Sequence, residues 1–554
     1  MKRILIIFLL PAYIVTYSQN LDSLFNKLME VRGMISQSIL PQSVKSSKPE
    51  KCGFGLFNAI KFNFSKFSLK QKAKITDIMQ RPSMDTSFVT PSGKFRIHYN
   101  KTGINAPGYD LIEFANAADS AYNYEVNVLG YPPPPADNGE GGDDKYDIYI
   151  QHQYGQYYGN TTPDQQISTK DSTWTSYISL DNAFSVNDSY KTNGIDAAKV
   201  TIAHEFHHAI QIGNYIDRYD KDSFYYELTS TSMEQFVYKS IKDYLNSLNE
   251  YFSNPSASFS SNSGYDLAIW NLFLASQFDN PGVPDSLRGK NIIRRTWRLM
   301  PKERALQTIA QAIDEAGSSF GKELNTFGQW TYFTGSRAEN GKYFDDAAQF
   351  PLIKPLMGLT FQNPPISLTV TTNAVSNNFL YFADKNNPTD TFLVAIISNS
   401  DIAGGIPSVP NQTSFDYKVS NQSFSGSQEI GSGYYFQMQT PNPSIFSTSY
   451  IFNGNPTVIT TGSIDYVYPQ PFKYSQNRIL NFPASGETGS FGDVYIYDIG
   501  MQLVYSSQAR VTDKRVIQWN GICSNGKKLG TGVYIYVTKC GDNIQKGKFV
   551  IYND

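Results

Sequence analysis

The residues best suited to chemistry lie in one short stretch, from His204 to His208. The chain has only five histidines, and three of them fall within this stretch. His204, Glu205 and His208 form the pattern H-E-x-x-H, and residues four apart share one face of a helix. The two imidazoles can therefore bind one zinc ion, while Glu205 lies close enough to act on a water that the metal holds. This stretch predicts a helix that carries part of a hydrolytic zinc site.

A site of this kind needs a third protein ligand, because catalytic zinc usually has three protein donors and one open position. Glu227, nineteen residues after His208, is the best local candidate. Gly213-Asn214 can end the first helix, and the polar residues Asp217–Asp222 are typical of a loop. A second helix that starts near Asp222 can then fold back and bring Glu227 against the two histidines.

The spacing resembles that of the gluzincin clan of zinc peptidases, in which a glutamate ligand follows H-E-x-x-H at this distance. It is closer still to a family of secreted bacterial metallopeptidases that read T-x-A-H-E-F-x-H-x-I-Q and then W/Y-x-E-x-x-A/S-x-x-M-E. The matching residues are Thr201, Ala203–Phe206, His208, Ile210, Gln211, Tyr225, Glu227, Met233 and Glu234. The resemblance extends upstream through F-R-I-H-Y, L-G-Y-P and Y-D-I-Y.

The resemblance implies a zinc ion on His204, His208 and Glu227, with Glu205 as the general base in peptide hydrolysis. It also implies a thermolysin-like domain with a mixed sheet, two active-site helices and a helical carboxy-terminal subdomain. Such sites usually draw a tyrosine or histidine from that helical half to stabilise the oxyanion. No histidine follows His208, so a tyrosine is required, and Tyr265 is one candidate among many.

Other interpretations of these residues stay open. Stacked histidines also occur on ordinary surface helices, and His207 points elsewhere on the helix, where we expect it to pack. Glu234 lies two turns beyond Glu227 on the same face, where it can orient a ligand histidine or remain solvated. Thermolysin-like enzymes carry an acidic residue four positions after the glutamate ligand, whereas this chain has Thr231 there.

Length and composition indicate a multidomain extracellular protein. A chain of 554 residues is too long for one core, and about two to four domains are expected. The formal net charge is −2 without a basic stripe, so we expect no nucleic-acid partner. The 38 Tyr and 36 Phe, with only 17% charged residues, favour β-rich modules over a helical cytosolic enzyme.

The amino-terminal residues 1–18 have the features of a secretory signal peptide. A basic start, Lys2-Arg3, precedes an apolar run from Ile4 to Val15, and cleavage is expected near Gln19. A membrane anchor is the other interpretation, but the run is shorter than the roughly 18–20 apolar residues that span a bilayer. No later stretch is apolar enough, so we expect a secreted or cell-surface protein with no membrane span after signal removal.

The three cysteines allow several arrangements. Cys523 and Cys540 are close in the sequence and can pair in an oxidising compartment. Cys52 is then left over, either as a buried unpaired thiol or as a propeptide thiol that caps the zinc. The surrounding Lys51-Cys52-Gly53-Phe54 does not reproduce the switch sequence of matrix metalloproteases.

Residue patterns divide the first two thirds of the chain into two regions. Residues 19–90 begin with helical spacing and predict a pro-segment or an amino-terminal helical module. Residues 91–355 are the expected metallopeptidase domain, with strands at 94–99, 146–150 and 176–180 and helices at 111–129 and 196–211. Asp143, Asp144 and Asp147 can hold Ca²⁺, although carboxylates in turns are common without a metal.

The remaining residues have the short alternating strands of β-sandwich modules. One β-sandwich is expected over 356–466, with strands near 366–372, 379–383 and 391–397. Residues 467–554 resemble the Ig-like domain of the hook-capping protein and the type IX secretion sorting domains, although Gln470 replaces Asn in the usual Y-P-N-P-F. The matching residues are Val494–Asp498, Trp519-Asn520-Gly521, Gly532–Tyr536 and Gly547-Lys548-Phe549. This resemblance implies contact with the secretion machinery or the cell surface, and a β-sandwich without a sorting role is the alternative.

These features together predict a multidomain α+β protein, a thermolysin-like zincin domain followed by two Ig-like β-sandwich domains. The predicted activity is that of a secreted zinc metalloendopeptidase acting on a protein or peptide substrate. The alternative is a surface-displayed binding protein with a degenerate peptidase domain, which Thr231 favours and the intact Glu205 opposes. Hydrolysis of a non-peptide bond is a third interpretation, because H-E-x-x-H does not specify the substrate.

Overall fold

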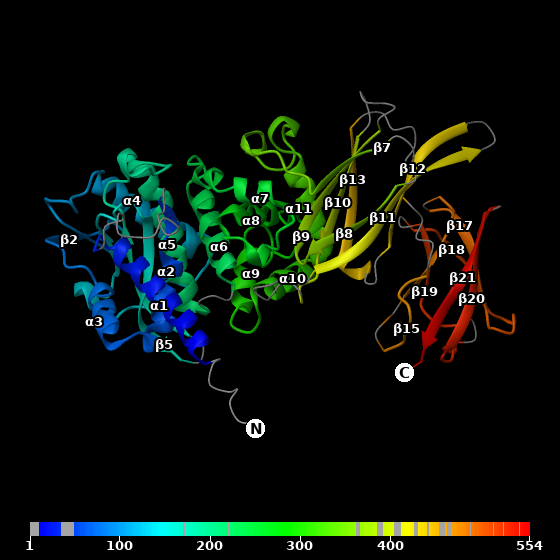
Figure 1. Ribbon diagram of the computed structural model, residues 1–554, viewed down its shortest axis with the longest axis horizontal. Coiled ribbons are helices and arrows are strands. Elements are labelled where there is room, and N and C mark those ends of the chain that lie inside the picture. The colour runs from blue at the N-terminus through cyan, green and yellow to red at the C-terminus, as the bar shows by residue number, and fades with distance from the viewer. Residues whose placement is uncertain are drawn as a thin grey trace, which may run out of the picture.

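The chain is elongated, with a mixed sheet and its helices at one end, a helical region in the middle and β-sheets at the other end (Figure 1). This arrangement is seen in a computed structural model, and it confirms a multidomain α+β architecture. The structure describes residues 10–34, 49–169, 172–218, 222–361, 366–384, 392–403, 412–425, 430–439, 443–453, 460–461, 467–475, 477, 479–487, 489–512, 515–523, 526–541 and 543–553.

A mixed six-stranded sheet frames the amino-terminal half. Its strands are β1 (Glu50–Cys52), β2 (Thr86–Val89), β3 (Phe95–Tyr99), β4 (Tyr146–Ile150), β5 (Tyr157–Ser168) and β6 (Thr173–Leu180). The order is β1-β5-β6-β4-β3-β2, with β1 parallel to β5 and β5 antiparallel to β6. The strands predicted at 94–99, 146–150 and 176–180 are confirmed as β3, β4 and β6, whereas β1, β2 and β5 were not predicted.

Three helices beside this sheet position the H-E-x-x-H motif. They are α4 (Leu111–Tyr122), which continues as the π-helical turn η3 (Asn123–Val128), α5 (Gly194–Asn214) and α6 (Ser223–Val237). Because α5 packs against β5, β6, α4 and α6, it is buried without a break from Val200 to Ile212. A helix buried all round is normally apolar all round, so its histidines and glutamate must find partners inside the protein.

The helical region after α6 extends the same hydrophobic core. Its elements are η6 (Asp243–Asn246), α7 (Asn249–Ser253), η7 (Phe259–Ser261), η8 (Tyr265–Leu267), α8 (Ala268–Gln277), α9 (Asn291–Leu299), α10 (Ala305–Glu315), α11 (Phe320–Tyr332), η9 (Gly335–Arg337) and η10 (Ala347–Gln349). Trp270 and Trp297 are fully buried within it. The short η4 (Glu140–Gly142) and η5 (Val186–Asp188) lie earlier in the chain.

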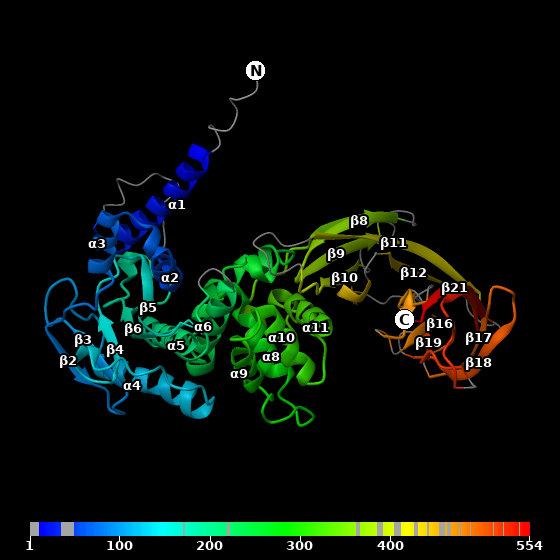
Figure 2. The same ribbon diagram turned by 90° about the horizontal axis from the view of Figure 1, so that it is seen from below.

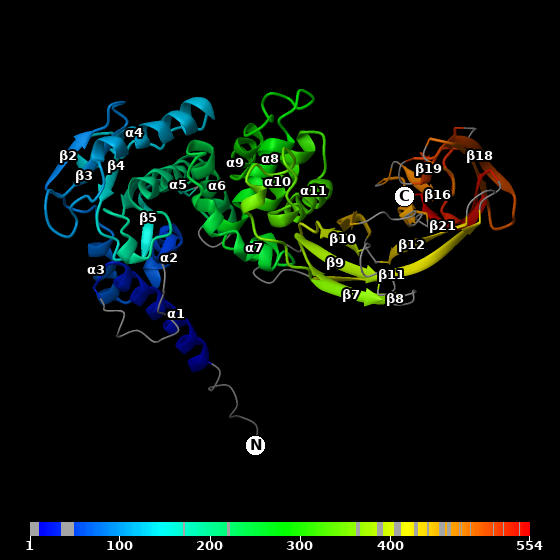
Figure 3. The same cartoon turned by 90° about the horizontal axis from the view of Figure 1, so that it is seen from above.

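The amino-terminal helices form a small unit with a core of its own. They are α1 (Leu10–Val31), α2 (Phe54–Asn63), η2 (Phe64–Lys66) and α3 (Leu69–Ile78), and they lie beside β5 (Figures 2 and 3). Their separate apolar cluster consists of Leu28, Phe57, Ile60, Phe67, Ile75 and Ile78. A capping box between Ser68 and Gln71 starts α3. Residues 1–9 of the predicted signal peptide lie outside the described residues.

Two four-stranded sheets follow the helical region. Their strands are β7 (Met357–Phe361), β8 (Ile366–Asn373), β9 (Ser376–Asp384), β10 (Phe392–Asn399), β11 (Gln412–Ser425), β12 (Ile430–Gln439), β13 (Phe446–Asn453), which follows η11 (Pro443–Ile445), and β14 (Thr460–Thr461). The orders are β13-β10-β9-β7 and β14-β12-β11-β8. Asn325 of α11 donates to the carbonyls of Ile396 and Ser447 at 3.1 and 3.0 Å, which joins the first sheet to the helical region.

The carboxy-terminal module has a five-stranded and a two-stranded sheet. Its strands are β15 (Phe472–Lys473), β16 (Leu480–Pro483), β17 (Phe491–Tyr497), β18 (Leu503–Arg510), β19 (Val516–Trp519), β20 (Gly532–Cys540) and β21 (Asn543–Tyr552). A hydrophobic core around Phe482 and Trp519 holds them together. Cys523 and Cys540 are both buried free thiols in this module, so the disulfide considered for them is not formed. Across the described residues, no helix has the length and apolar character needed to cross a membrane.

Candidate metal centre

Two neighbouring helices bring the predicted ligands together. His204 and His208 come from adjacent turns of α5, and Glu227 comes from α6. The helices pack against each other, and the side-chain amide of Gln211 on α5 donates to the carbonyl of Tyr226 on α6 at 3.1 Å. All three ligand side chains are buried. Their polar atoms therefore depend on one another, or on a metal, for partners.

The three donor atoms form a nearly equilateral triangle. Nε2 of His204 lies 3.2 Å from Nε2 of His208, and Oε2 of Glu227 lies 3.1 Å from the first and 3.3 Å from the second. Nitrogen and oxygen ligands about 2.0–2.1 Å from a tetrahedral zinc ion lie about 3.3 Å apart. The type and spacing of the donors therefore fit zinc.

The second nitrogen of each ligand histidine is held by the protein. His204 Nδ1 lies 2.8 Å from Oε1 of Glu234, and His208 Nδ1 lies 2.8 Å from Oε1 of Gln211. Such partners fix the ring and the tautomer, which leaves Nε2 free to bind a metal. Of the two roles considered for Glu234, the structure therefore favours orientation of His204 over solvation.

A fourth donor, outside the predicted ligand set, completes the cluster. The donor atoms of Cys52, His204, His208 and Glu227 all lie within 4.8 Å of one another. Cys52 ends β1 and is buried and unpaired. The sequence allowed two interpretations of this thiol, a buried unpaired thiol or a propeptide thiol that binds the zinc. The residues around Cys52 did not distinguish between them. The position of Cys52 depends on β1 pairing with β5, and neither strand was predicted.

Glu205 lies beside the cluster without forming part of the triangle. Thr161 Oγ1 on β5 donates to Oε2 of Glu205 at 2.8 Å, and the Cys52 thiol hydrogen-bonds the same side chain. Burial raises the pKa of this carboxyl, against the attraction of the two ligand histidines. A buried carboxylate with a raised pKa is suited to accept and return a proton near neutral pH.

The electrostatics of the triangle favour positive charge. Burial would lower the pKa of His204, but its hydrogen bonds to Glu227 and Glu234 outweigh burial and raise this pKa to about 10. Burial would likewise raise the pKa of Glu227, but His208 and His204 together lower it to about 2. The carboxylates therefore stabilise a cation at this point, and a divalent metal ion would meet the same preference.

The remaining histidines lie away from the triangle. His207 Nδ1 is 2.8 Å from Oε2 of Glu125, and its ring packs edge-on against Tyr131. Burial lowers the pKa of His207 well below its usual value, so the ring is neutral and structural, as expected. His98 Nε2 lies 2.7 Å from Asp147 Oδ1, which also indicates a structural role.

Tyr265, one of many tyrosines considered for the oxyanion role, lies beside the cluster. The ring of Tyr265 stacks near that of His204, with 6.1 Å between ring centroids. The preceding residue, Gly264, has φ +100, and an added Cβ would lie 2.1 Å from the Phe224 carbonyl and 3.0 Å from Glu227 Cβ. Only glycine fits this close approach to α6. The turn therefore brings Tyr265 to the ligand helices.

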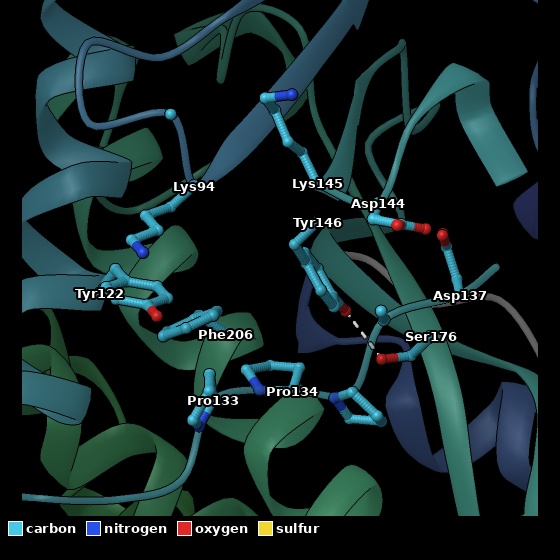
Figure 4. Close-up of a pocket in the computed structure, with 13 residues that line it drawn as sticks. Lys94, Tyr122, Pro133, Pro134, Asp137, Asp144, Lys145, Tyr146, Ser176 and Phe206 are labelled. Carbon is cyan, nitrogen blue, oxygen red and sulfur yellow. Dashed lines mark hydrogen bonds between the residues drawn. The ribbon is translucent and has the colours of Figure 1, made fainter. Parts of the chain in front are cut away.

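A separate hollow of about 230 Å³ lies on the other side of α5 (Figure 4). Phe206 points into it, whereas the zinc ligands do not line it. Its rim includes Asp144, one of the residues considered for Ca²⁺. The neighbouring carboxylates are already paired with protein cations, Asp143 with Arg96 and Lys145, and Asp147 with Arg81.

Comparisons with known proteins add little to this description. No protein-family model matches the chain, and no curated protein matches it. Among solved structures, PorZ, an essential bacterial surface component of the type-IX secretion system of Porphyromonas gingivalis, is 14% identical over 29% of this chain and 29% of its own, with a TM-score of 0.14. Dimeric latent PorU from the same organism is 12% identical over 36% of this chain and 19% of its own, with a TM-score of 0.16. Both TM-scores are too low for these likenesses to bear on the fold or the site.

Proposed function

We propose that this protein is a secreted zinc-dependent metalloendopeptidase of gluzincin type, in which His204, His208 and Glu227 hold the metal. The observation that carries the proposal is the triangle of donor atoms, which lie 3.1–3.3 Å apart. The buried carboxylate of Glu205 lies beside this triangle and is not one of its donors. A degenerate site would have no need for oriented histidines, for a third ligand on a second helix and for Glu205 together. The proposed fold of this region is thermolysin-like, with α5 and α6 as the active-site helices.

The chemistry follows from the positions of the side chains. Zinc, when bound, supplies a Lewis acid that polarises a scissile carbonyl and lowers the pKa of a water. Glu205 takes the proton from that water and returns it to the leaving amine, as a general base and then a general acid. Thr161 holds Oε2 of Glu205, so that Oε1 is the oxygen available for this transfer. Tyr265 stabilises the negative charge that develops on the carbonyl oxygen.

Two variants separate catalysis from metal binding. Glu205→Gln should retain the zinc content of the wild type and lose cleavage of a broad peptide library, because an amide cannot accept the proton. Glu227→Ala should bind zinc more weakly than the wild type, because the site loses one of its donors. Metal analysis of the purified full chain measures the zinc content, and protease profiling compares wild type and variants before and after treatment with a mercurial, which binds the cysteine thiol near the metal site. Full cleavage by Glu205→Gln would refute the proposed base, and undiminished zinc in Glu227→Ala would remove this residue from the ligand set.

A second function is carried by the carboxy-terminal module. We propose that residues 467–554 attach the protein to the secretion machinery or the cell surface, since their sequence resembles type IX sorting domains. If the zinc site proves inactive on every peptide and on non-peptide substrates, the protein is a surface-displayed binding protein, and the β-sheet modules carry its function. A zinc-dependent hydrolase of a non-peptide bond would retain zinc, lose activity in Glu205→Gln and cleave no peptide.

A further inference from the structure

The chain covers its own candidate active site with the segment Glu50–Phe54. β1 adds to the free edge of β5, where Glu50 pairs with Tyr157 and Cys52 with Gly159. Glu50 N donates to the Gln156 carbonyl at 2.7 Å, and Gly53 N donates to the Gly159 carbonyl at 2.9 Å. The other edge of β5 is already paired with β6. The segment therefore takes the edge of β5 that β6 leaves open, on a strand that packs against α5.

The thiol of this segment supplies a fourth donor beside the triangle. Cys52 Sγ joins the donors of His204, His208 and Glu227 within 4.8 Å, and thiolate is a strong zinc ligand. We infer that Cys52 is the fourth protein ligand of the metal and that Glu50–Phe54 is an autoinhibitory segment. The ligand assignment stands on the donor cluster alone, whereas the inhibitory consequence rests on the proposed peptidase function.

The residues on either side of Cys52 hold the thiol in place. Lys51 Nζ lies 3.0 Å from Oε2 of Glu234, the residue that orients His204, and it also pairs with Asp243. The same ammonium lies over the ring of Tyr158, 4.8 Å from its centroid. A buried cation with two carboxylates and an aromatic face is strongly fixed. Lys51 therefore anchors the segment to α6 and to β5.

Phe54 and Gly53 fix the other side of the thiol. The ring of Phe54 stacks on His208 with centroids 4.2 Å apart and an angle of 11° between the planes. An added Cβ on Gly53 would lie 2.9 Å from Cβ of Asn160, so the close approach to β5 requires glycine. Lys51, Gly53 and Phe54 therefore all have contacts specific to the site, which a thiol that merely happened to be buried nearby would not require.

Closure of the site has two consequences for catalysis. A zinc ion with four protein ligands has no position for substrate or water, as in structural zinc sites. An extended peptide substrate that adds to a sheet edge also needs the edge of β5, which β1 occupies. The described form is therefore latent. Activity requires Cys52 to leave the metal, its sulfur to regain a proton from solvent, and the segment to leave β5.

The amino-terminal helices give this segment a means of release. Phe54 begins α2, whose side chains form a separate core with α1 and α3. Because these helices have a core of their own, they can move away as a unit. The move breaks the contacts of Cys52 and Phe54 in the main core and those of α2 with β5. Proteolysis after α3 or a mercurial that binds the Cys52 sulfur would shift the equilibrium towards the open form.

The ligand assignment is tested on the full-length wild type, without relying on an active enzyme. Zinc-edge X-ray absorption should show one sulfur ligand, and cobalt-substituted protein should show a thiolate-to-cobalt absorption band. Both signals should be lost in Cys52→Ser and retained in Cys523→Ser, a matched change of a buried thiol in the carboxy-terminal module. Absence of sulfur from the wild-type metal spectrum would overturn the assignment, whatever the activity of the protein.

The inhibitory role is tested with the same variants and a peptide library. The wild type and Cys523→Ser should show no cleavage until treated with a mercurial, whereas Cys52→Ser should cleave without treatment. If the metal has a sulfur ligand but neither Cys52→Ser nor the treated wild type cleaves any peptide, the peptidase function fails while the ligand assignment stands. If the untreated wild type cleaves as fast as Cys52→Ser, the segment is not inhibitory and the peptidase function stands.

Discussion

At the scale of single residues, the site depends on partners that point each imidazole at the metal. Gln211 accepts from His208 Nδ1 and donates to the Tyr226 carbonyl, so one amide connects a ligand to the second helix. Ser230 Oγ also lies 3.2 Å from His208 Nδ1. Outer partners of this kind typically change metal affinity by about 10–100-fold.

We therefore expect Gln211→Ala to weaken zinc binding by about 10–100-fold while the fold is retained. Competition with a coloured chelator measures the affinity, and circular dichroism monitors the helices. Gln235→Ala is the control. Gln235 is a buried amide of α6, and its Nε2 donates to the Lys239 carbonyl instead of to a proposed metal ligand. Equal zinc affinity in the two variants would show that Gln211 does not orient His208.

A second residue-scale effect concerns Asp266, which follows the candidate oxyanion tyrosine. Burial, and then repulsion by Glu250, raise the pKa of Asp266 to about 7. The folded protein therefore binds this proton more tightly than the unfolded chain, whose Asp has its ordinary value. The stabilisation is present at low pH and is lost as the pH rises from about 4 to 7.

Asp266→Asn should remove this loss of stability at higher pH, because the amide side chain does not ionise. The melting temperature of the variant should exceed that of the wild type at pH 8 by more than it does at pH 5, as measured by differential scanning fluorimetry. The exposed Asp314→Asn serves as the control and should show no such dependence on pH. A constant difference between Asp266→Asn and the wild type across this range would contradict the buried-proton explanation.

The sequence predicted these residues unevenly, for physical reasons. His204, Glu205, His208 and Glu227 were identifiable because a helical repeat and one loop place them locally. Their partners Gln211 and Glu234 lie on the same helices. Orientation of a ligand histidine was one of two roles considered for Glu234, whereas no role was predicted for Gln211. For Cys52, the sequence left a zinc-capping thiol and a buried unpaired thiol as alternatives. Its place is set by strand pairing with residues far along the chain, and period-two strand signals are weak in so short a segment.

At the scale of elements, η8 must approach α6 closely for Tyr265 to lie beside the proposed metal ligands on α5 and α6. Gly264 makes this approach possible, with its positive φ and its contact with the Phe224 carbonyl. The unpredicted strand β5 has a comparable role, because it supplies Thr161 to Glu205 and its edge to the segment Glu50–Phe54. Its sequence contains Pro163 and a run of polar residues, so it lacks the alternating pattern of a typical strand.

Gly264→Ala should therefore destabilise the protein and reduce the peptidase activity of the open form, in which Cys52 has left the metal. The positive φ alone costs about 1–2 kcal/mol for a residue with a Cβ, and the collision with α6 adds to it. Gly341→Ala is the matched control, since Gly341 also has positive φ, +73, but no atom lies within 4 Å of an added Cβ. Thermal melting should show a larger loss for Gly264→Ala, and equal losses would refute the packing explanation.

At the scale of the whole molecule, the described residues contain two large hydrophobic cores that share no residue, and we expect these cores to unfold as separate units. The first extends from Cys52 to Ile396 and includes the mixed sheet, the helical region and part of the middle sheets. The second lies within the carboxy-terminal module, from Val467 to Ile551. The alternating residue patterns of the sequence predicted β-rich modules over residues 356–466 and 467–554. It did not predict that Asn325 would bond the Ile396 carbonyl, 71 residues away, because pairing across such distances leaves no local pattern.

This division predicts how the protein responds to metal removal. A ligand that binds only the folded state stabilises it by about 4 kcal/mol when its free concentration is a thousand times its dissociation constant. All four donors belong to the first core or are buried within its helices, and none belongs to the second. In calorimetry of the full chain, a chelator should lower the transition of the first core and leave that of the carboxy-terminal module in place. Added zinc should restore the first transition, whereas equal shifts of both transitions would show that the metal binds elsewhere or that the two cores unfold together.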